Sequence, residues 1–123
     1  MAQPYDAARA TTNVTAAADP WTVNLPAGIV AGDALLVFMR TGGAQTFNLP
    51  AGWSWLVQND TGDASDDVTS IIYRKADGAE GATLSVDLSA AAKGAAIAYR
   101  IPYAEDPTVV APGVSAAVVK SAP

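Results

Sequence analysis

Short hydrophobic stretches, separated by turn-forming Gly, Pro, Asn and Asp, recur along the chain from residue 21 to residue 101. In residues 83–88, Leu84, Val86 and Leu88 alternate with polar positions, which places the three apolar side chains on one face of a strand. The same reasoning predicts strands over residues 21–25, 34–40, 45–49, 53–58, 68–75, 83–88 and 95–101. Their number and spacing are typical of an all-β fold, a single β-sandwich of jelly-roll or immunoglobulin-like type.

Two stretches depart from simple alternation. Residues 35–39 are apolar at every position, which predicts a central strand that is covered on both faces. Residues 89–98 are rich in Ala and suit either a helix or a loop followed by a strand. Gly94 interrupts the helical pattern, and Ile97 and Tyr99 then alternate with other residues, so we favour the loop and strand.

The two ends differ from the middle of the chain. Residues 1–20 are mostly small or polar, and Val14 is the only Val, Leu or Ile among them; a short strand over residues 13–16 is compatible with this composition. Residues 102–123 contain four Pro residues, which exclude a regular helix. We therefore predict a sandwich domain over residues 21–101, with flexible N-terminal and C-terminal arms on either side of it.

One five-residue sequence occurs twice. Asn-Leu-Pro-Ala-Gly stands at residues 24–28 and again at residues 48–52. We interpret each copy as a corner of the sandwich, in which Leu points inward, Pro ends the strand pairing and Gly allows the chain to turn.

Composition removes several classes of function. The chain has 123 residues, which suits one domain, and seven Lys and Arg against twelve Asp and Glu give a net charge of −5. An acidic chain is a poor partner for nucleic-acid phosphates. The absence of Cys and His excludes disulfides, thiolate or imidazole metal sites and Ser-His-Asp triads. We expect no enzyme activity, no cofactor and no membrane segment.

The acidic loop at residues 60–67 is the strongest candidate ion site in the sequence. Asp60, Asp63, Asp66 and Asp67 offer oxygen ligands of the kind that Ca²⁺ prefers. Their spacing does not match an EF-hand loop, and Asp and Gly also form ordinary turns. We therefore favour a solvated loop over a calcium site.

Three Trp residues are candidate ligand contacts. Trp53 and Trp55 are two residues apart and are expected on one face of a strand, and Trp21 opens an earlier strand. Such rings form a stacking platform for a sugar or a flat protein surface when they are exposed, and fill the core when they are buried. We favour the core for at least one of the Trp53 and Trp55 pair.

Five segments resemble, in the same order, a module of the virion structural proteins of tailed bacteriophages. They are residues 23–28, 31–38, 49–53, 72–83 and 98–101. The resemblance implies a β-sandwich displayed on a virion and carries no catalytic motif with it. It fits heads as well as tails.

Within that resemblance, the small size and the two arms favour a capsid decoration, or cement, protein. Its implied partner is the major capsid protein of the same phage, whose assembled shell it bridges after synthesis in the host bacterial cytoplasm. We expect its acidic surface to face basic patches on the shell, and we expect a homo-oligomer, preferably a trimer. The arm residues expected to contact the shell are Tyr5, Arg9, Val14, Tyr103, Val109 and Val110.

The main alternative is a tail or baseplate adhesin domain that binds a cell-surface glycan. Its contacts would come from the Trp residues and the acidic loop, with Ca²⁺ as a possible ligand, and the residues concerned are Trp21, Trp53, Trp55, Asp60 and Asp63. A third hypothesis is an immunoglobulin-like spacer without a partner of its own.

Overall fold

Strands account for all the regular secondary structure that the computed structural model describes, which covers residues 8–61 and 67–102. No helix occurs in these two ranges, so the predicted all-β class is confirmed. The strands are β1 (Ala8–Ala18), β2 (Trp21–Asn24), β3 (Ala34–Thr41), β4 (Ser54–Asp60), β5 (Val68–Lys75), β6 (Thr83–Val86) and β7 (Ala92–Ile101).

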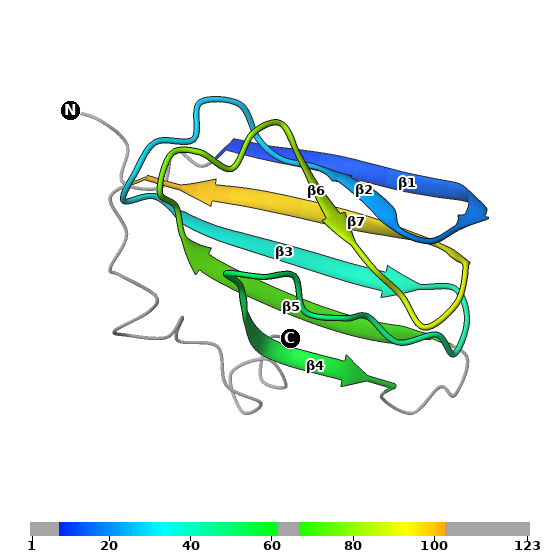
Figure 1. The fold of residues 1–123 in the computed structure, drawn as a ribbon. Helices are drawn as coiled ribbons and strands as arrows, with labels where there is room; N and C mark the ends of the chain where they lie inside the picture. Colours follow the sequence, from blue (N-terminus) through cyan, green and yellow to red (C-terminus); the bar gives the residue numbers. More distant parts are fainter. Residues whose placement is uncertain (1–7, 62–66, 103–123) are drawn as a thin grey trace, which may run out of the picture.

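The strands form two antiparallel sheets that pack against each other as a β-sandwich. The large sheet has five strands in the order β1-β7-β3-β5-β4, and the small sheet pairs β2 with β6. Figure 1 shows the small sheet lying over one face of the large sheet. We call that covered face the inner face, and we call the opposite face of the large sheet the outer face.

Side chains from both sheets fill the space between them. On β3, Leu35, Val37 and Met39 point inward and are at most 1% exposed. From the small sheet, Trp21 and Val86 are completely buried against them. The predicted inward positions of the 83–88 segment are confirmed, because Val86 and Leu88 are buried and Leu84 packs against the core.

The N-terminal arm predicted for residues 1–20 is wrong for residues 8–18, which form β1. This strand pairs with β7 from Ala8 opposite Arg100 to Val14 opposite Gly94, and again at Ala18 opposite Ala92 after a shift in register. Its inward positions are small, so they fit beneath the neighbouring sheet without large side chains. The sandwich therefore begins at least thirteen residues earlier than the predicted boundary at residue 21.

The strand predicted for residues 45–49 is also wrong. Phe47 forms a single β-bridge with Leu88, and the Asn48 amide donates to the Asp87 carbonyl at 2.9 Å. The segment thus runs beside the continuation of β6 without becoming a full strand. Phe47 nevertheless reaches the core, where it is 2% exposed.

The expectation that β3 is covered on both faces is wrong for its outer face. β3 lies at the centre of the large sheet as predicted, between β7 and β5. Its inner side chains are buried, but Phe38 on the outer face is 37% exposed. In the described ranges no second layer of strands lies over this face.

Candidate binding surface

Trp21 belongs to the core and offers no stacking surface. Its ring is 0% exposed and meets Phe47 edge to face, with ring centroids 5.1 Å apart. Its Nε1 donates to the Ala92 carbonyl at 3.0 Å, so its only polar atom is satisfied internally. The candidate glycan role of Trp21 is therefore excluded by its burial.

Trp53 and Trp55 do not form the paired platform that their spacing predicts. Trp53 precedes β4 and is 6% exposed, and the Arg74 guanidinium lies over its ring, 5.9 Å from the centroid. Trp55 lies within β4 opposite Ile72, is half-buried and packs against the core. The expectation that at least one of this pair lies in the core is confirmed, because Trp53 is buried.

The acidic loop is only partly described. Asp60 lies at the exposed end of β4, and Asp67 forms an ion pair with Arg40. Asp63 and Asp66 lie outside the described residues. Within the described ranges no three acidic side chains come close enough together to hold a metal ion.

The predicted arm contacts separate into three groups. Val14 lies in β1 and packs against the core, so its predicted role as an arm contact is replaced by a role in the fold. Arg9 lies in the same strand and is exposed on the outer face, opposite Tyr99. The remaining predicted contacts lie outside the described residues: Tyr5, Tyr103, Val109 and Val110.

The outer face of the large sheet carries two apolar rows that cross its three middle strands. In the first row Leu36 lies between Tyr73 and Tyr99, and in the second row Phe38 lies between Ile71 and Ile97. Phe38 and Tyr99 link the rows edge to face, with ring centroids 5.6 Å apart. We call these six residues the apolar face: Leu36, Phe38, Ile71, Tyr73, Ile97 and Tyr99.

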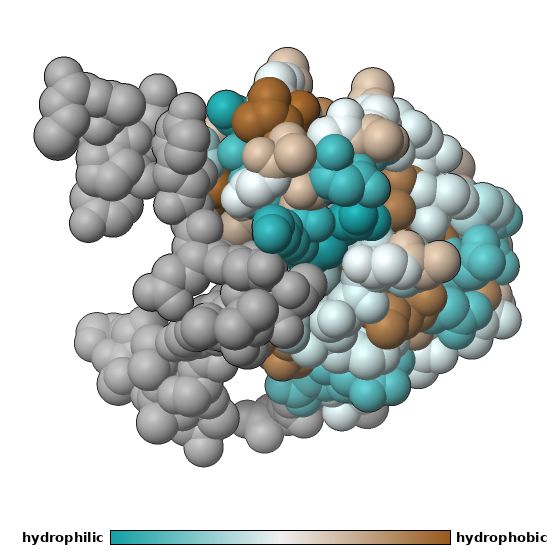
Figure 2. Space-filling model, turned by 60° about the vertical axis from the view of Figure 1, so that its left-hand side comes forward, coloured by the Kyte–Doolittle hydropathy of each residue, from teal (hydrophilic) through white to brown (hydrophobic). Residues whose placement is uncertain are grey.

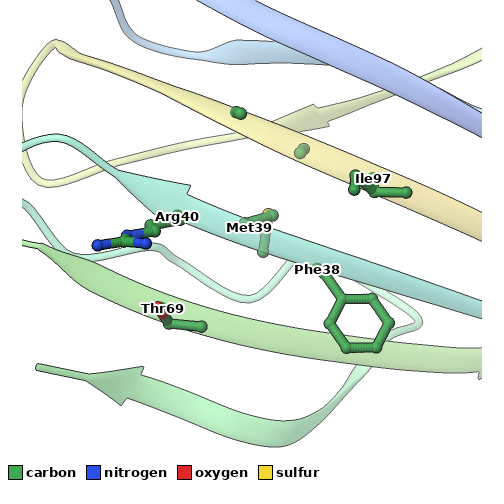
Figure 3. Close-up of a pocket in the computed structure, with 7 residues that line it drawn as sticks. Phe38, Met39, Arg40, Thr69 and Ile97 are labelled. Atoms are coloured by element: carbon green, nitrogen blue, oxygen red, sulfur yellow. The ribbon is translucent and has the colours of Figure 1, made fainter. Parts of the chain in front are cut away.

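The outer face is hollowed beside the second row, on the side where Arg40 lies between Thr69 and Ala95. A depression of about 340 Å³ lies between β3, β5 and β7, with small side chains at Thr69 and Ala95 beside the larger Phe38 and Ile97. Figure 3 shows the labelled lining residues coming from these three neighbouring strands. Arg40 lies at the border of the hollow and is exposed. The shape and chemistry of the hollow suit an apolar side chain.

The outward side of the small sheet has the opposite character. Its exposed positions are Thr22 and Asn24 on β2 and Thr83 and Ser85 on β6, none of them large or apolar. This polar surface needs no cover. The two outward surfaces of the same sandwich therefore differ, and only the large sheet presents apolar rows to its surroundings.

Two Asn side chains form hydrogen bonds to backbone groups beside the outer strands of the large sheet. On β1, the Thr11 carbonyl accepts from Asn24 Nδ2 at 3.2 Å. On β4, Asn59 accepts from the Phe47 amide at 2.8 Å and donates to the Phe47 carbonyl at 3.2 Å. Asn59 has a φ of 46°, which Asn tolerates better than most residues. The first contact takes up a backbone carbonyl of the edge strand β1, and the second ties the backbone of Phe47 to β4.

The two copies of Asn-Leu-Pro-Ala-Gly each place a glycine with positive φ against an arginine. Gly28 lies against Arg100 and Gly52 against Arg74, and these two arginines flank Leu35 from the neighbouring strands. The predicted inward Leu is confirmed for the first copy, where Leu25 is 7% exposed. It is wrong for the second copy, where Leu49 is 39% exposed.

Each of these arginines is held by carboxylates. Arg100 Nε contacts Asp33 Oδ2 at 2.9 Å, and Asp33 is almost completely buried. Arg74 Nε contacts Glu80 at 3.1 Å, and Arg74 Nη2 contacts Asp77 at 3.4 Å. Figure 2 brings forward the end of the sandwich where β3 begins, and its surface is hydrophilic with separate apolar areas.

Asp77 has a perturbed carboxyl group. The Ala79 amide donates to Asp77 Oδ1 at 2.8 Å and, together with contributions from Glu80 and the Arg74 charge, holds the pKa of Asp77 below its usual value. The group is fully exposed, so it stabilises a turn and is not poised for proton transfer. These charged side chains hold the adjoining loops against β5 and β7.

Comparisons with known proteins identify no relative. No family model, no curated protein and no solved structure matches the chain significantly. None of the described residues form a helix long and apolar enough to cross a membrane. The function therefore has to be argued from the apolar face and its surroundings.

Proposed function

We propose that this chain is a capsid decoration protein, a non-catalytic structural protein of a phage virion that binds the assembled shell. The observation that carries the proposal is the apolar face of the large sheet. Of its six side chains, Phe38 is exposed, Ile71 is buried at 7% exposure and the other four are half-buried. Contiguous, partly exposed apolar side chains that no strand of the described ranges covers are typical of a protein-interaction surface. In this proposal the apolar face contacts the major capsid protein and helps to bridge neighbouring subunits.

The surroundings of the apolar face support docking through this face. The Asn24 amide occupies the Thr11 carbonyl on the edge strand β1. The outward side of the small sheet is polar. Of the two outward sheet surfaces, the large sheet therefore offers a partner more apolar area to bury.

The size of the outer face supports additional contacts from the ends of the chain. Five strands about 5 Å apart and about eight residues long give a footprint of about 650 Å². A stable interface commonly needs about 800 Å² on each partner. Residues 1–7 and 103–123, which carry Tyr5, Tyr103, Val109 and Val110, would supply the difference, as would neighbouring copies in a homo-oligomer such as a trimer.

The polar side chains of the described ranges support a structural role. Asp33 and Glu80, the two most buried carboxylates, each face an arginine at 3.1 Å or less. The sequence has neither Cys nor His to act as nucleophile or base near neutral pH. The proposed mechanism is mechanical: each bound copy adds contact energy, and binding to one state of the shell stabilises that state by mass action.

The test is immunogold labelling of intact virions produced by cells that carry this coding sequence. We expect gold spread over the heads. Gold confined to tail tips or fibres would overturn the decoration proposal and favour the glycan-binding adhesin. Absence of gold from every particle would overturn the virion assignment itself.

A matched pair of variants tests whether the apolar face is the docking surface. Phe38→Asp places a charge in the apolar face, and Thr22→Asp places one on the polar outward side of the small sheet. Both positions are exposed, so both variants should fold, which circular dichroism checks. We expect Thr22→Asp to decorate particles that lack the native protein and Phe38→Asp to lose at least about tenfold in affinity. Equal binding of the two variants would mean that the docking surface lies elsewhere on the protein.

A further inference from the structure

We propose that the partner of the apolar face is an acidic protein surface, which offers an apolar side chain to the hollow and carboxylates to Arg9 and Lys93. This inference rests on the proposed function in treating the apolar face as the docking surface, and it adds the chemistry of the surface that docks there. The net charge of −5, taken over the whole chain, predicts a basic partner. The distribution of charge over the fold predicts the opposite for this face.

The basic side chains of the described ranges gather on the outer face of the large sheet. Four of the six basic residues lie on this face, and only two of the seven acidic residues lie on it or beside it. The basic residues of the outer face are Arg9, Arg40, Lys75 and Lys93, and the acidic residues are Asp60 and Asp67. The acidic residues elsewhere in the described ranges are Asp19, Asp33, Asp77, Glu80 and Asp87. An acidic chain therefore presents one face with an excess of positive charge.

Two of these basic side chains have no acidic partner within the described ranges. Neither Arg9 nor Lys93 has a described carboxylate within ion-pair distance, and both are exposed. By contrast, Arg40 pairs with Asp67, and the two inner-face arginines are held by carboxylates of their own loops. Arg9 and Lys93 are therefore the basic groups that carboxylates of a partner can neutralise without breaking an ion pair of this domain.

Arg9 and Lys93 lie on either side of the hollow. Arg9 lies opposite Tyr99 of β7, and Lys93 precedes Tyr99 by six residues on that strand, which is about 20 Å. Ala95 and Ile97 line the hollow and lie between these two positions. A partner that places one apolar side chain in the hollow therefore meets a basic group on each side of that contact.

An apolar centre with a charged border is the usual arrangement of a protein interface. Burial of the apolar side chains supplies most of the affinity, while border charges raise the association rate and disfavour partners of like charge. A second copy of this chain is disfavoured as the occupant, because its own outer face carries the same excess of positive charge. A surface with carboxylates around an apolar side chain is complementary in both respects.

An anionic membrane would also attract basic side chains, but the number and spacing of the charges favour a protein. Clusters that bind anionic lipids commonly contain about four to eight Lys or Arg close together. The described part of the outer face has four, divided between its two ends, and Arg40 is already paired. The hollow beside Ile97 also suits a single side chain.

Two double variants with the same change in net charge test the proposal on particles that lack the native protein. Arg9→Gln with Lys93→Gln removes two positive charges beside the hollow. Thr22→Asp with Thr83→Asp adds two negative charges on the outward side of the small sheet. The four positions are exposed, and circular dichroism checks that both variants fold. At low salt we expect the first variant to bind at least about tenfold more weakly than the second.

Salt provides an internal check on this comparison, because it screens exposed charges. The difference between the two variants should shrink as the salt concentration rises. Equal binding of the two at low salt would overturn the proposal. Tighter binding by the variant without Arg9 and Lys93 would overturn it in favour of a basic partner.

A measurement on the free protein separates failure of this inference from failure of the decoration proposal. The probe is a synthetic peptide with a central Phe flanked by Glu residues, and its control carries Lys in place of Glu. In NMR spectra we expect the Glu peptide at millimolar concentration to shift the amide signals of Arg9, Phe38 and Ile97, and the Lys peptide to leave them unchanged. No preference for the Glu peptide would contradict the proposal.

The combined outcomes assign the failure. Heads that carry gold, together with no preference for the Glu peptide, would retain decoration and remove the acidic partner. Particles without gold, together with a clear preference, would retain the acidic partner and remove the virion. Sedimentation of the protein with phosphatidylserine vesicles, without a response to the Glu peptide, would overturn the inference in favour of a lipid surface.

Discussion

The same strands form the inner and outer faces of the large sheet, but the small sheet buries only the inner face. Along β3, Val37 and Met39 point to the inner face and are buried by the small sheet, while Leu36 and Phe38 point to the outer face. Both faces are apolar, but only one is covered by strands of the described ranges. The difference shows that apolar residues on both sides of a strand indicate two contact surfaces. The domain itself can bury one of them and leave the other uncovered.

The largest expected effect is at Gly94, on the inner face. A Cβ on this residue would lie 2.1 Å from the Arg40 carbonyl oxygen and 2.5 Å from the Trp21 ring. Gly94→Ala should therefore lower the free energy of unfolding by more than about 3 kcal/mol, or prevent folding. Ala95→Ser, one residue along on the outer face, should change it by less than about 0.5 kcal/mol. Urea unfolding followed by Trp fluorescence measures the free energy of unfolding of both variants. Similar losses would contradict the difference in packing between the two faces.

The second prediction compares neighbours on β3. Met39→Ala removes a buried inner side chain and should cost about 2 to 3 kcal/mol, because it leaves a cavity. Phe38→Ala removes a larger side chain that is already 37% exposed, and should cost about 1 kcal/mol. Thermal and chemical denaturation of the two variants measure the difference. A larger loss for Phe38→Ala would mean that the outer face is packed as tightly as the inner one.

The third prediction compares two ion pairs. Arg100 reaches a buried Asp33 from the inner face, so Arg100→Ala should cost about 2 kcal/mol by leaving that carboxylate without its charge partner. Arg40 pairs with Asp67 beside the outer face and is 66% exposed, so Arg40→Ala should cost less than about 0.5 kcal/mol. The same denaturation series at low and high salt separates them, since salt screens the exposed pair more strongly.

The smallest effect is the pH dependence at Asp77. Its pKa is lowered in the folded protein, so its contribution to stability is present above the unfolded pKa and is lost as the pH falls through the folded pKa. Asp77→Asn should therefore be less stable than the natural chain near neutral pH, and the difference should vanish in acid. Urea unfolding of the two proteins from about pH 6 to about pH 2 measures it. A difference that persists in acid would assign the effect to lost packing.

Most strands could be predicted because hydrophobic alternation is strong where both layers contribute to the core. β5 occupies the predicted residues 68–75, and β3 extends the predicted 34–40 by one residue. β1 was missed because its inward positions, Ala8, Ala10, Thr12 and Val14, are mostly small. Their period of two was nevertheless visible, alternating with Arg9, Thr11 and Asn13. Small residues suffice there because β7 supplies the pairing.

The candidate surface was harder to predict than the fold. Sequence spacing placed Trp53 and Trp55 together, but it could not show that Arg74 covers Trp53 or that Trp21 lies beneath the sheet against Gly94. Those contacts join residues far apart in the chain. The sequence predicts the three strands that carry the apolar face, but not how they pair. The register of the folded sheet sets Phe38 between Ile71 and Ile97.

The amide of Asn24 bears on how this domain behaves when many copies are crowded together. A flat, apolar, strand-rich domain is exposed to fibril growth, in which edges recruit further edges without limit. The Asn24 side chain occupies the Thr11 carbonyl of the edge strand β1 and so interrupts such growth at this point of the edge. Concentrated protein should therefore add further copies less readily along the β1 edge than along an unobstructed edge.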